Sequence, residues 1–288
     1  MRIPESIPER DSDRRTLPEF VSSGMGDRAQ MTTIVIPMAG RSQRFFDAGY
    51  KTPKYMLPIG GRSMFAHAVR SFEPYFDEAR FVFVARAPWG TAAFLRKEIA
   101  TLGIVRHAVV MLEEETDGQA ETVLPGVDGA AVGDDEALTI FNVDNFRPGF
   151  LYPDDPTIAG SDGLLETFSA PGDRWSFVLP ARDVPGAAAD TPQTLVARTT
   201  EKQRISDLCS TGLYHFGRTG DFREACAAST RLDTEGAPGD RERHVAPLYN
   251  HLISLGRRVH YTHVEAQTVI ECGTPEAYEA LAASNTRP

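Results

Sequence analysis

Cysteine is scarce in this sequence, and long apolar runs are missing from it. The three cysteines, Cys209, Cys226 and Cys272, are an odd number without metal-ligand spacing, which argues against a disulfide framework or a zinc site and predicts reduced thiols. No apolar run approaches the roughly 20 residues of a membrane span, and the N-terminus lacks the apolar stretch of a signal peptide. We therefore expect a cytoplasmic protein with no membrane partner.

Basic side chains are outnumbered in this chain of 288 residues, with 30 Lys and Arg against 40 Asp and Glu and a formal net charge of −10. Such a charge repels nucleic acid and anionic membranes unless a local basic patch overrides it. We therefore expect small-molecule partners and no nucleic-acid partner. The oligomeric state stays open, a homo-oligomer included.

The first 30 residues differ in composition from the rest. Residues 1–30 are rich in Pro, Ser, Asp, Glu and Arg and have no sustained apolar period, so they bury too little surface to offset the entropy of ordering. We predict a disordered tail over 1–30 and a single domain over 31–288. Within that domain, a regular part at about 31–150 precedes a less regular part at about 151–288.

Short apolar runs alternate with helical periodicity in the first part. The runs typical of buried strands are Thr33–Pro37, Phe81–Val84, Ala108–Leu112 and Leu138–Val143, and the segments with helical spacing are Ser63–Phe72, Thr91–Ala100 and Ala120–Val127. This alternation predicts a Rossmann-like α/β fold with a mainly parallel sheet and helices on both faces. The ligand crevice of such a sheet lies at the carboxyl ends of its strands.

The second part has a weaker pattern. Its predicted strands are Trp175–Pro180, Leu195–Arg198, Gly212–Phe216 and Val259–Val264, and its predicted helices are Thr219–Ala228, Val245–Leu255 and Pro275–Ala282. Links that contain Gly and Pro lie at Pro153–Asp162, Pro185–Pro192 and Thr234–Gly239. They indicate insertions into one core rather than a separate domain.

A loop of small residues with basic neighbours follows the first predicted strand. Its small residues allow the backbone to approach an anion closely, and they are Ala39, Gly40 and Ser42. The basic residues within the next fourteen positions are Arg41, Arg44, Lys51 and Lys54. Because transfer at phosphorus requires fixed positive charge, we predict a triphosphate-binding loop in which Arg44 and Lys54 are catalytic. A solvated basic loop is the alternative, since the loop is neither a Walker motif nor a dinucleotide fingerprint.

The stretch from Ile34 to Phe65 resembles the signature of the nucleotide-sugar pyrophosphorylases, in which a glycine-rich loop, an Arg, a spacer and Pro-Lys precede an apolar run. The resemblance is closest to a capsule-associated branch that includes cytidylyltransferases. It implies a GT-A-like nucleotidyltransferase fold, with a nucleotide-binding part at about 31–150 and an acceptor-binding part at about 151–288. The loop residues that it assigns to the nucleotide are Met38, Ala39, Gly40, Arg41, Ser42 and Gln43. Gly40 stands alone where the family often has two or three glycines, and Arg41 adds a side chain there.

Two carboxylates match the metal-binding positions of that family. Asp144 ends a predicted strand and matches the first metal aspartate, although a lone Asp at such a place is more often a cap or turn residue. Glu271 stands at the second position, where the family has an aspartate, and its side chain is one methylene longer. The resemblance thus implies Mg²⁺ as cofactor, bound by these carboxylates and by substrate oxygens. Thr274 and Pro275 also predict a helix start, as cap and first-turn residue.

The segment from Asp117 to Thr122 matches the family's nucleobase-binding segment and offers Gly118 and Glu121 as nucleotide-binding residues. Several relatives that use uridine or thymidine nucleotides have Gln at the place of Glu121. An ionised carboxylate only accepts hydrogen bonds, which suits the exocyclic amine of cytosine. We therefore expect CTP to be the favoured nucleotide.

Three residues of the second part resemble the family's acceptor-side segments, namely Glu201, Lys202 and Gly212. The resemblance implies that Lys202 binds the phosphate of the acceptor. A surface Glu-Lys pair in a turn is the alternative for the first two.

The chain is therefore expected to transfer a nucleoside monophosphate to a small phosphorylated acceptor, a sugar 1-phosphate or a non-sugar phosphate, with release of pyrophosphate. The resemblance to the capsule branch implies a role in cell-surface polysaccharide. One alternative is a nucleotide-sugar glycosyltransferase, which would normally carry Asp-x-Asp where this chain has Asn142-Val143-Asp144. Another is a catalytically inactive nucleotide-binding homologue, which Glu271 and the single glycine permit.

Overall fold

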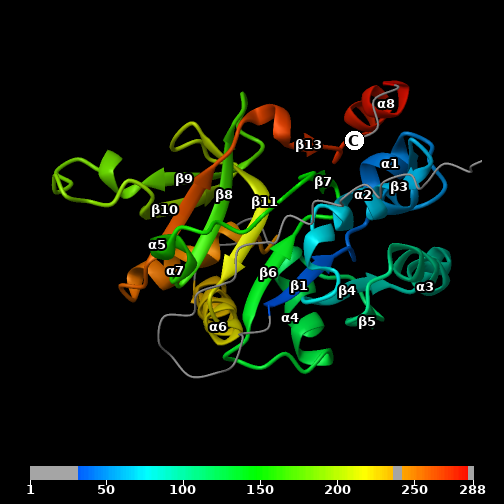
Figure 1. The fold of residues 1–288 in the computed structure, drawn as a ribbon, viewed down its shortest axis with the longest axis horizontal. Coiled ribbons are helices and arrows are strands. Elements are labelled where there is room, and N and C mark those ends of the chain that lie inside the picture. The colour runs from blue at the N-terminus through cyan, green and yellow to red at the C-terminus, as the bar shows by residue number, and fades with distance from the viewer. Residues whose placement is uncertain (1–31, 236–241, 285–288) are drawn as a thin grey trace, which may run out of the picture.

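The structure is a computed structural model that describes residues 32–235 and 242–284, so the tail predicted over 1–30 lies outside the described residues. One mixed, nine-stranded sheet runs through the molecule with helices on both faces (Figure 1). Its strands follow the order β10-β9-β11-β6-β1-β4-β5, and β8 pairs with both β11 and β12. Their bounds are β1 Thr32–Pro37, β4 Arg80–Arg86, β5 His107–Leu112, β6 Ala137–Phe141, β8 Gly163–Ser169, β9 Ser176–Pro180, β10 Val196–Glu201, β11 Leu208–Phe216 and β12 Val259–His263.

The first half of the sheet is parallel, as the alternation of strand and helix predicts. Strand β1 pairs in parallel with β4 on one side and β6 on the other, and β4 pairs in parallel with β5. Side chains of β1 alternate between the faces: Ile34 and Ile36 belong to one buried apolar cluster and Val35 to another. The α/β fold class with a mainly parallel central sheet is confirmed.

The helices divide between these two clusters. Helices α1, α2, α3 and α8 contribute buried side chains to the cluster of Ile34, and helices α4, α6 and α7 contribute to the cluster of Val35. Their bounds are α1 Gln43–Asp47, α2 Met64–Arg70, α3 Thr91–Leu102, α4 Gln119–Gly129, α5 Pro156–Ala159, α6 Thr219–Glu235, α7 Tyr249–Ser254 and α8 Pro275–Ala283. Both faces of the parallel strands are therefore covered.

The order in which the chain adds strands to the sheet changes side at β1. From β1 it moves to β4 and β5 on one side, and then returns to β6 on the other side of β1. The segments that follow the carboxyl ends of β1 and β6, which lead into α1 and β7, therefore leave the sheet on two sides of a crevice. The loop after β1 and the segment after β6 meet at this crevice.

Several predicted bounds in this fold are wrong. Strand β6 ends at Phe141, so Asp144 lies beyond the strand rather than at its last position. Strand β10 extends to Glu201, which places that residue at a strand end and not in a turn, and β11 begins four residues before Gly212. The helix predicted from Val245 is a 3-10 turn over Ala246–Leu248 followed by the short α7.

Strand β8 is the main element that the sequence pattern does not predict. Glu166 interrupts its apolar run, but this carboxylate is buried and accepts hydrogen bonds from Nε and Nη2 of Arg147 at 2.7 and 2.9 Å. The link predicted over Pro153–Asp162 contains the short α5, and Pro185–Pro192 lies outside helices and strands. The link predicted from Thr234 begins inside α6, and 236–241 lie outside the described residues. Over the described ranges, no helix is long and apolar enough to cross a membrane.

A small two-stranded sheet closes one side of the crevice. Strands β7 (Asn145–Phe146) and β13 (Ile270–Glu271) pair antiparallel, with Glu271 opposite Asn145. The N–H of Cys272 donates to the carbonyl oxygen of Asp144 at 2.8 Å. Helix α8 follows directly, capped by the Thr274 hydroxyl with Pro275 in the first turn, as predicted. Segments more than 120 positions apart are thereby joined where the two carboxylates lie.

Candidate active site

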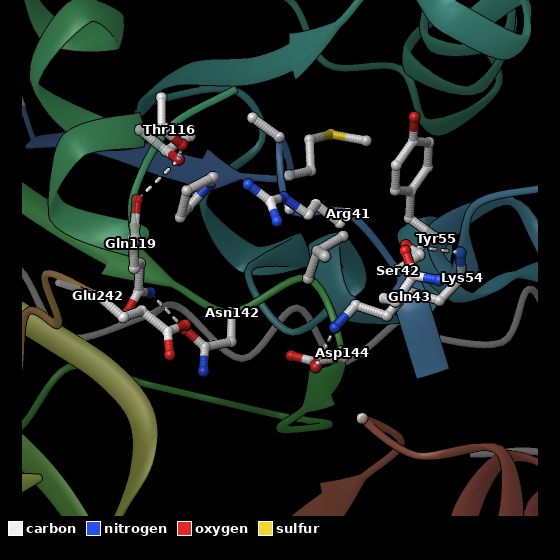
Figure 2. A pocket seen from close by; sticks show the side chains of 18 of the residues that line it. Arg41, Ser42, Gln43, Lys54, Tyr55, Thr116, Gln119, Asn142, Asp144 and Glu242 are labelled. Atoms are coloured by element: carbon white, nitrogen blue, oxygen red, sulfur yellow. Dashed lines mark hydrogen bonds and ion pairs between the residues drawn. The ribbon is translucent and has the colours of Figure 1, made fainter. Parts of the chain in front are cut away.

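A cavity of about 570 Å³ lies at the crevice between β1 and β6 (Figure 2). Its walls are the loop after β1, the segment that leads into α4, and the segment that follows β6. All the loop residues that the sequence assigns to nucleotide binding line it, namely Met38, Ala39, Gly40, Arg41, Ser42 and Gln43. The catalytic candidates Arg44 and Lys54 line it as well.

The loop after β1 returns on itself so that Lys54 faces the cavity. Ser42 adopts a left-handed backbone conformation with φ 54°, immediately before the short helix α1. Its hydroxyl oxygen accepts a hydrogen bond from the backbone N–H of Lys54 at 3.2 Å. Met38 and Ala39 are buried, so they present mainly backbone to the cavity. The loop therefore combines close backbone access with a fixed base for the Lys54 side chain.

Arg41, which adds a side chain to the loop, is paired with a carboxylate of another segment. Its Nε lies 2.6 Å from Oε2 of Glu115, and Nη1 of Arg86 lies 2.8 Å from Oε1 of the same carboxylate. Glu115 is therefore paired with two guanidinium groups, one from the loop after β1 and one from the end of β4. The Arg41 side chain projects into the cavity in Figure 2.

A second cavity of about 460 Å³ adjoins the first on the side of β13. The residues that line both cavities are Arg44, Lys54, Asp144 and Gly273. The smaller cavity is further lined by Lys202, Arg174 and Glu271. The two catalytic candidates and the first metal candidate thus stand at the junction of two spaces large enough for small substrates.

Asp144 and Glu271 converge on Gly273 at this junction. A Cβ at position 273 would stand 2.8 Å from Oδ2 of Asp144 and 3.1 Å from Oε1 of Glu271. Lys54 Nζ lies 2.6 Å from Oδ2 of Asp144, and Arg174 Nη2 lies 2.8 Å from Oε2 of Glu271. Figure 2 marks the pair of Lys54 and Asp144 with a dashed line. The oxygens therefore gather around a space that only glycine leaves open.

This donor set fits a magnesium ion that also binds substrate oxygens. Mg²⁺ is usually bound by one or two carboxylates, with waters and substrate phosphates as its other ligands. Among the described residues, no group of three or more His, Cys, Asp or Glu side chains is arranged to hold a metal ion. Asp144 and Glu271 would therefore provide two of the ligands of such an ion, and waters or substrate oxygens would provide the others. The cysteines, which were expected to be reduced, are free and buried.

In the segment that is expected to bind the nucleobase, Gly118 lines the larger cavity and Glu121 does not. Glu121 accepts a hydrogen bond from the N–H of Asp117 at 2.8 Å, and its Oε1 lies 2.9 Å from Nη1 of Arg243. Gln119, which the sequence argument missed, lines the cavity and donates to Oδ1 of Asn142 (Figure 2). The carboxylate expected to read the base is thus directed at an arginine.

Arg243 approaches the nucleobase segment through its backbone as well. A Cβ at Gly118 would stand 2.3 Å from the Arg243 nitrogen, and the φ of Gly118 is +137°. Position 118 therefore requires glycine. Glu242 and His244, on either side of Arg243, also line the larger cavity. Sequence patterns gave no signal for these two, because they follow an irregular segment with no matching motif.

The acceptor candidates separate in the structure. Lys202 lines the smaller cavity, has φ 53°, and its Nζ lies 3.2 Å from Oε2 of Glu242. Glu201 lines neither cavity and accepts a hydrogen bond from the hydroxyl of Ser176.

Gly212 also lies outside both cavities. Its φ is +85°, and a Cβ there would stand 2.7 Å from Nδ2 of Asn142. The glycine thus makes room for a side chain of the nucleotide cavity. A direct contact of Gly212 or Glu201 with the acceptor stays a prediction.

Comparison with known proteins gives a family for this arrangement. A family model described as the MobA-like NTP transferase domain matches residues 34–215. No curated protein matches the chain. The matched residues include the loop after β1, the nucleobase segment and Asp144.

Solved structures extend the likeness to nearly the whole described chain. A nucleoside-diphosphate-sugar pyrophosphorylase from Vibrio cholerae RC9 is 43% identical, with a TM-score of 0.79 over 86% of this chain and 99% of that one. The inositol-1-phosphate CTP transferase from T. maritima is 13% identical, with a TM-score of 0.63 over 91% and 100%. A UDP-glucose pyrophosphorylase from Acinetobacter is 15% identical, with a TM-score of 0.59 over 88% and 92%. The last two share the fold.

Proposed function

We propose that this chain, which belongs to the family of MobA-like NTP transferase domains, transfers a nucleoside monophosphate from a nucleoside triphosphate to a small phosphorylated acceptor. One observation carries the proposal. Arg44, Lys54 and Asp144 line two adjoining cavities at once. A transferase of this kind requires separate places for nucleotide and acceptor, with fixed positive charge where they meet.

The geometry supports a direct displacement. The triphosphate lies along the loop after β1 in the larger cavity, and the acceptor phosphate lies in the smaller cavity beside Lys202. An oxygen of the acceptor phosphate attacks the α-phosphorus in line, a new P–O bond forms, and the bond to the departing pyrophosphate breaks. Arg44 and Lys54 stabilise the charge that develops on the transferred group and on the pyrophosphate. No covalent bond to the enzyme is needed.

Asp144 and Glu271 are the residues that would hold Mg²⁺. The ion supplies positive charge to the phosphate oxygens and lowers the cost of bringing two anionic substrates together. Glu271 has one methylene more than the family's aspartate, and the pairing of β13 with β7 places its Oε1 beside the Gly273 position. The longer carboxylate therefore still reaches the place that Asp144 faces.

For the nucleotide we propose CTP, and Glu121 remains the residue that motivates this choice. Because its carboxylate is paired with Arg243, reading of cytosine requires either an exchange of that partner or a base contact through Gln119. A Glu121→Gln variant with a raised UTP to CTP ratio of kcat/KM would support the role of Glu121. UTP turnover equal to or above CTP turnover in the unaltered enzyme would overturn the CTP proposal.

The wider role proposed is the supply of an activated building block for a cell-surface polysaccharide. A sugar 1-phosphate suits the likeness to a nucleoside-diphosphate-sugar pyrophosphorylase, and a non-sugar phosphate suits the capsule-associated resemblance. Both acceptors carry the phosphate that the chemistry needs. Nucleoside triphosphates are cytoplasmic metabolites, so we propose that the enzyme acts there.

The deciding experiment is a pyrophosphate-release screen of the purified chain. It crosses CTP, UTP, ATP and GTP with a panel of phosphorylated acceptors, with and without Mg²⁺. Pyrophosphate release that depends on Mg²⁺ and on one acceptor class is the expected result. Release of a nucleoside diphosphate from nucleotide sugars would favour a glycosyltransferase, and nucleotide binding without turnover would favour an inactive homologue.

A further inference from the structure

The two carboxylates at Gly273 are each paired with a different cation. Lys54 Nζ lies 2.6 Å from Asp144, and Arg174 Nη2 lies 2.8 Å from Glu271. Lys54 already has a role in the proposed function, whereas no sequence motif draws attention to Arg174. The symmetry of the two pairs suggests that Arg174 does for one substrate what Lys54 does for the other.

Arg174 is held on a rigid support despite its exposed position. Its guanidinium carbon lies 4.5 Å from the centroid of the Trp175 ring, a cation–π contact. The indole N–H of Trp175 donates to the carbonyl oxygen of Pro171 at 3.1 Å, and Phe168 packs edge-on against the ring. The guanidinium therefore has a defined place at the rim rather than the freedom of a typical surface arginine.

The turn that carries Arg174 is anchored from the other side by Arg204. Nη1 of Arg204 donates to the carbonyl oxygens of Ala170 and Gly172, at 3.1 and 2.7 Å. Such a fixed turn reduces the ordering cost that a flexible arginine would incur when a ligand binds. A prearranged guanidinium fork is suited to two oxygens of one phosphate group.

The position of Arg174 separates the acceptor from the nucleotide. Arg174 and Lys202 line the smaller cavity, and neither lines the larger one. An anionic group in the smaller cavity would therefore meet Arg174 and Lys202 in addition to the shared Arg44 and Lys54. The same walls carry the carboxylates of Asp144, Asp173 and Glu271, of which Asp144 and Glu271 would hold the cation. A doubly charged phosphate suits these walls better than a neutral alcohol.

We propose that Arg174 binds the phosphate of the acceptor and exchanges partners to do so. Without a divalent cation it is paired with Glu271; when Glu271 binds the cation, Arg174 loses its counter-charge and binds the acceptor phosphate. The inference rests on the proposed function and narrows its acceptor to a phosphomonoester. Arg174 therefore competes with the divalent cation for Glu271, and it stabilises the bound acceptor phosphate once the cation is in place.

Two titrations of the purified chain, both without nucleotide, test the exchange. Mn²⁺ is titrated alone by electron paramagnetic resonance, and inorganic phosphate is titrated by calorimetry into the protein loaded with Mg²⁺. In Arg174→Ala, Mn²⁺ binding becomes about two- to fivefold tighter, the range expected when a partly exposed ion pair no longer competes. Phosphate binding becomes about tenfold weaker or more, as expected for the loss of a charge-assisted contact.

Opposite changes in the two titrations distinguish this role from a structural one, because a distorted site would weaken both. Arg174→Lys retains part of the phosphate affinity, since it keeps the charge and loses the planar fork. Arg182→Ala is the matched control, because Arg182 is a half-exposed arginine that lines neither cavity, and both affinities stay as in the unaltered chain.

Unchanged phosphate affinity or weaker Mn²⁺ binding in Arg174→Ala would overturn the inference, as would an unaltered chain that binds no phosphate. Neither titration depends on turnover, so a failed pyrophosphate screen leaves them interpretable. Pyrophosphate release together with unchanged titrations would contradict only the role of Arg174.

Discussion

At the scale of single residues, the site is built from charges that stand close together in a sheltered place. Lys54 and Asp144 have side chains 24% and 18% exposed, and their charged atoms are 2.6 Å apart. Attraction between charges is stronger where water is partly excluded than on the open surface. The Lys54 ammonium is therefore positioned between the two cavities without the help of substrate.

Removal of either shared cation should damage turnover. We expect Lys54→Ala and Arg44→Ala each to lower kcat about 10²-fold or more, the size found when one preorganised charge-stabilising group is lost. Initial rates of pyrophosphate release measure the effect. Lys97→Ala and Arg62→Ala are matched controls that line neither cavity. Changes under threefold in both site variants would remove the basis for the catalytic assignment.

Gly273 offers a test of the metal site that removes no charge. In Gly273→Ala, the added methyl group would stand 2.8 Å from Oδ2 of Asp144, so we expect Mn²⁺ binding to weaken about tenfold or more while the melting temperature changes little. Electron paramagnetic resonance and thermal denaturation give the two readouts. Gly160→Ala is the control, because a Cβ there meets only the Pro156 carbonyl oxygen at 3.4 Å. Normal Mn²⁺ binding in Gly273→Ala would show that the ion lies elsewhere.

At the scale of elements, a buried ion pair holds the small β7–β13 sheet to the main sheet. Arg147 follows β7 and is paired with Glu166 of β8, and both side chains are buried. Nη1 of Arg147 also donates to the carbonyl oxygen of Thr268, just before β13, at 3.0 Å. The segment that follows Asp144 and the segment that precedes Glu271 are thereby held to the main sheet.

Removal of one partner of the Arg147–Glu166 pair should lower the free energy of unfolding more than replacement of both partners. We expect Arg147→Met or Glu166→Met alone to lower the free energy of unfolding by about 3–5 kcal/mol, because each leaves an uncompensated buried charge. The double variant should be more stable than either single variant, since an apolar pair of similar volume has no charge to bury. Urea denaturation gives the three values. A double variant less stable than both singles would refute the argument.

At the scale of the whole molecule, buried histidines make stability depend on pH. Burial lowers the pKa of His215 from 6.5 to about 4, and its Nδ1 is 2.9 Å from the hydroxyl of Thr139. Burial also lowers the pKa of His67 and of His260. The unfolded chain takes up a proton at His215 below pH 6.5, whereas the folded chain stays neutral there until about pH 4.

The free energy of unfolding should therefore fall as the pH decreases from about 6.5 to 4. The contribution of His215 over this window is at most about 3.5 kcal/mol, from about 1.4 kcal/mol per pKa unit. Urea denaturation at pH 7.5, 6 and 5 measures the slope. His215→Gln should flatten it, whatever its stability at pH 7.5. An equal slope in the variant would assign the pH dependence to other groups.

The sequence by itself was sufficient for local features of this protein. The apolar runs of β1, β4, β5 and β6 predicted the parallel core, because each is a short buried segment bounded by turn residues. The loop from Met38 to Lys54 predicted a phosphate-binding site through its small residues and dense charge, and several of its residues line the larger cavity. Thr274 and Pro275 marked the start of α8, since a helix cap is a contact between near neighbours.

Only the tertiary structure decided which distant residues meet. Strand β8 was hidden because the partner of Glu166 is not a chain neighbour, and Arg174 had no motif because its meaning depends on Glu271, 97 positions away. The sequence pattern likewise did not predict that Glu121 is paired with Arg243. Side-chain periodicity reports burial within one element, whereas the partner of a buried charge is set by packing between elements. The sequence therefore determined the residues of the loop after β1, which are chain neighbours, and the tertiary structure decided which distant residues line the smaller cavity.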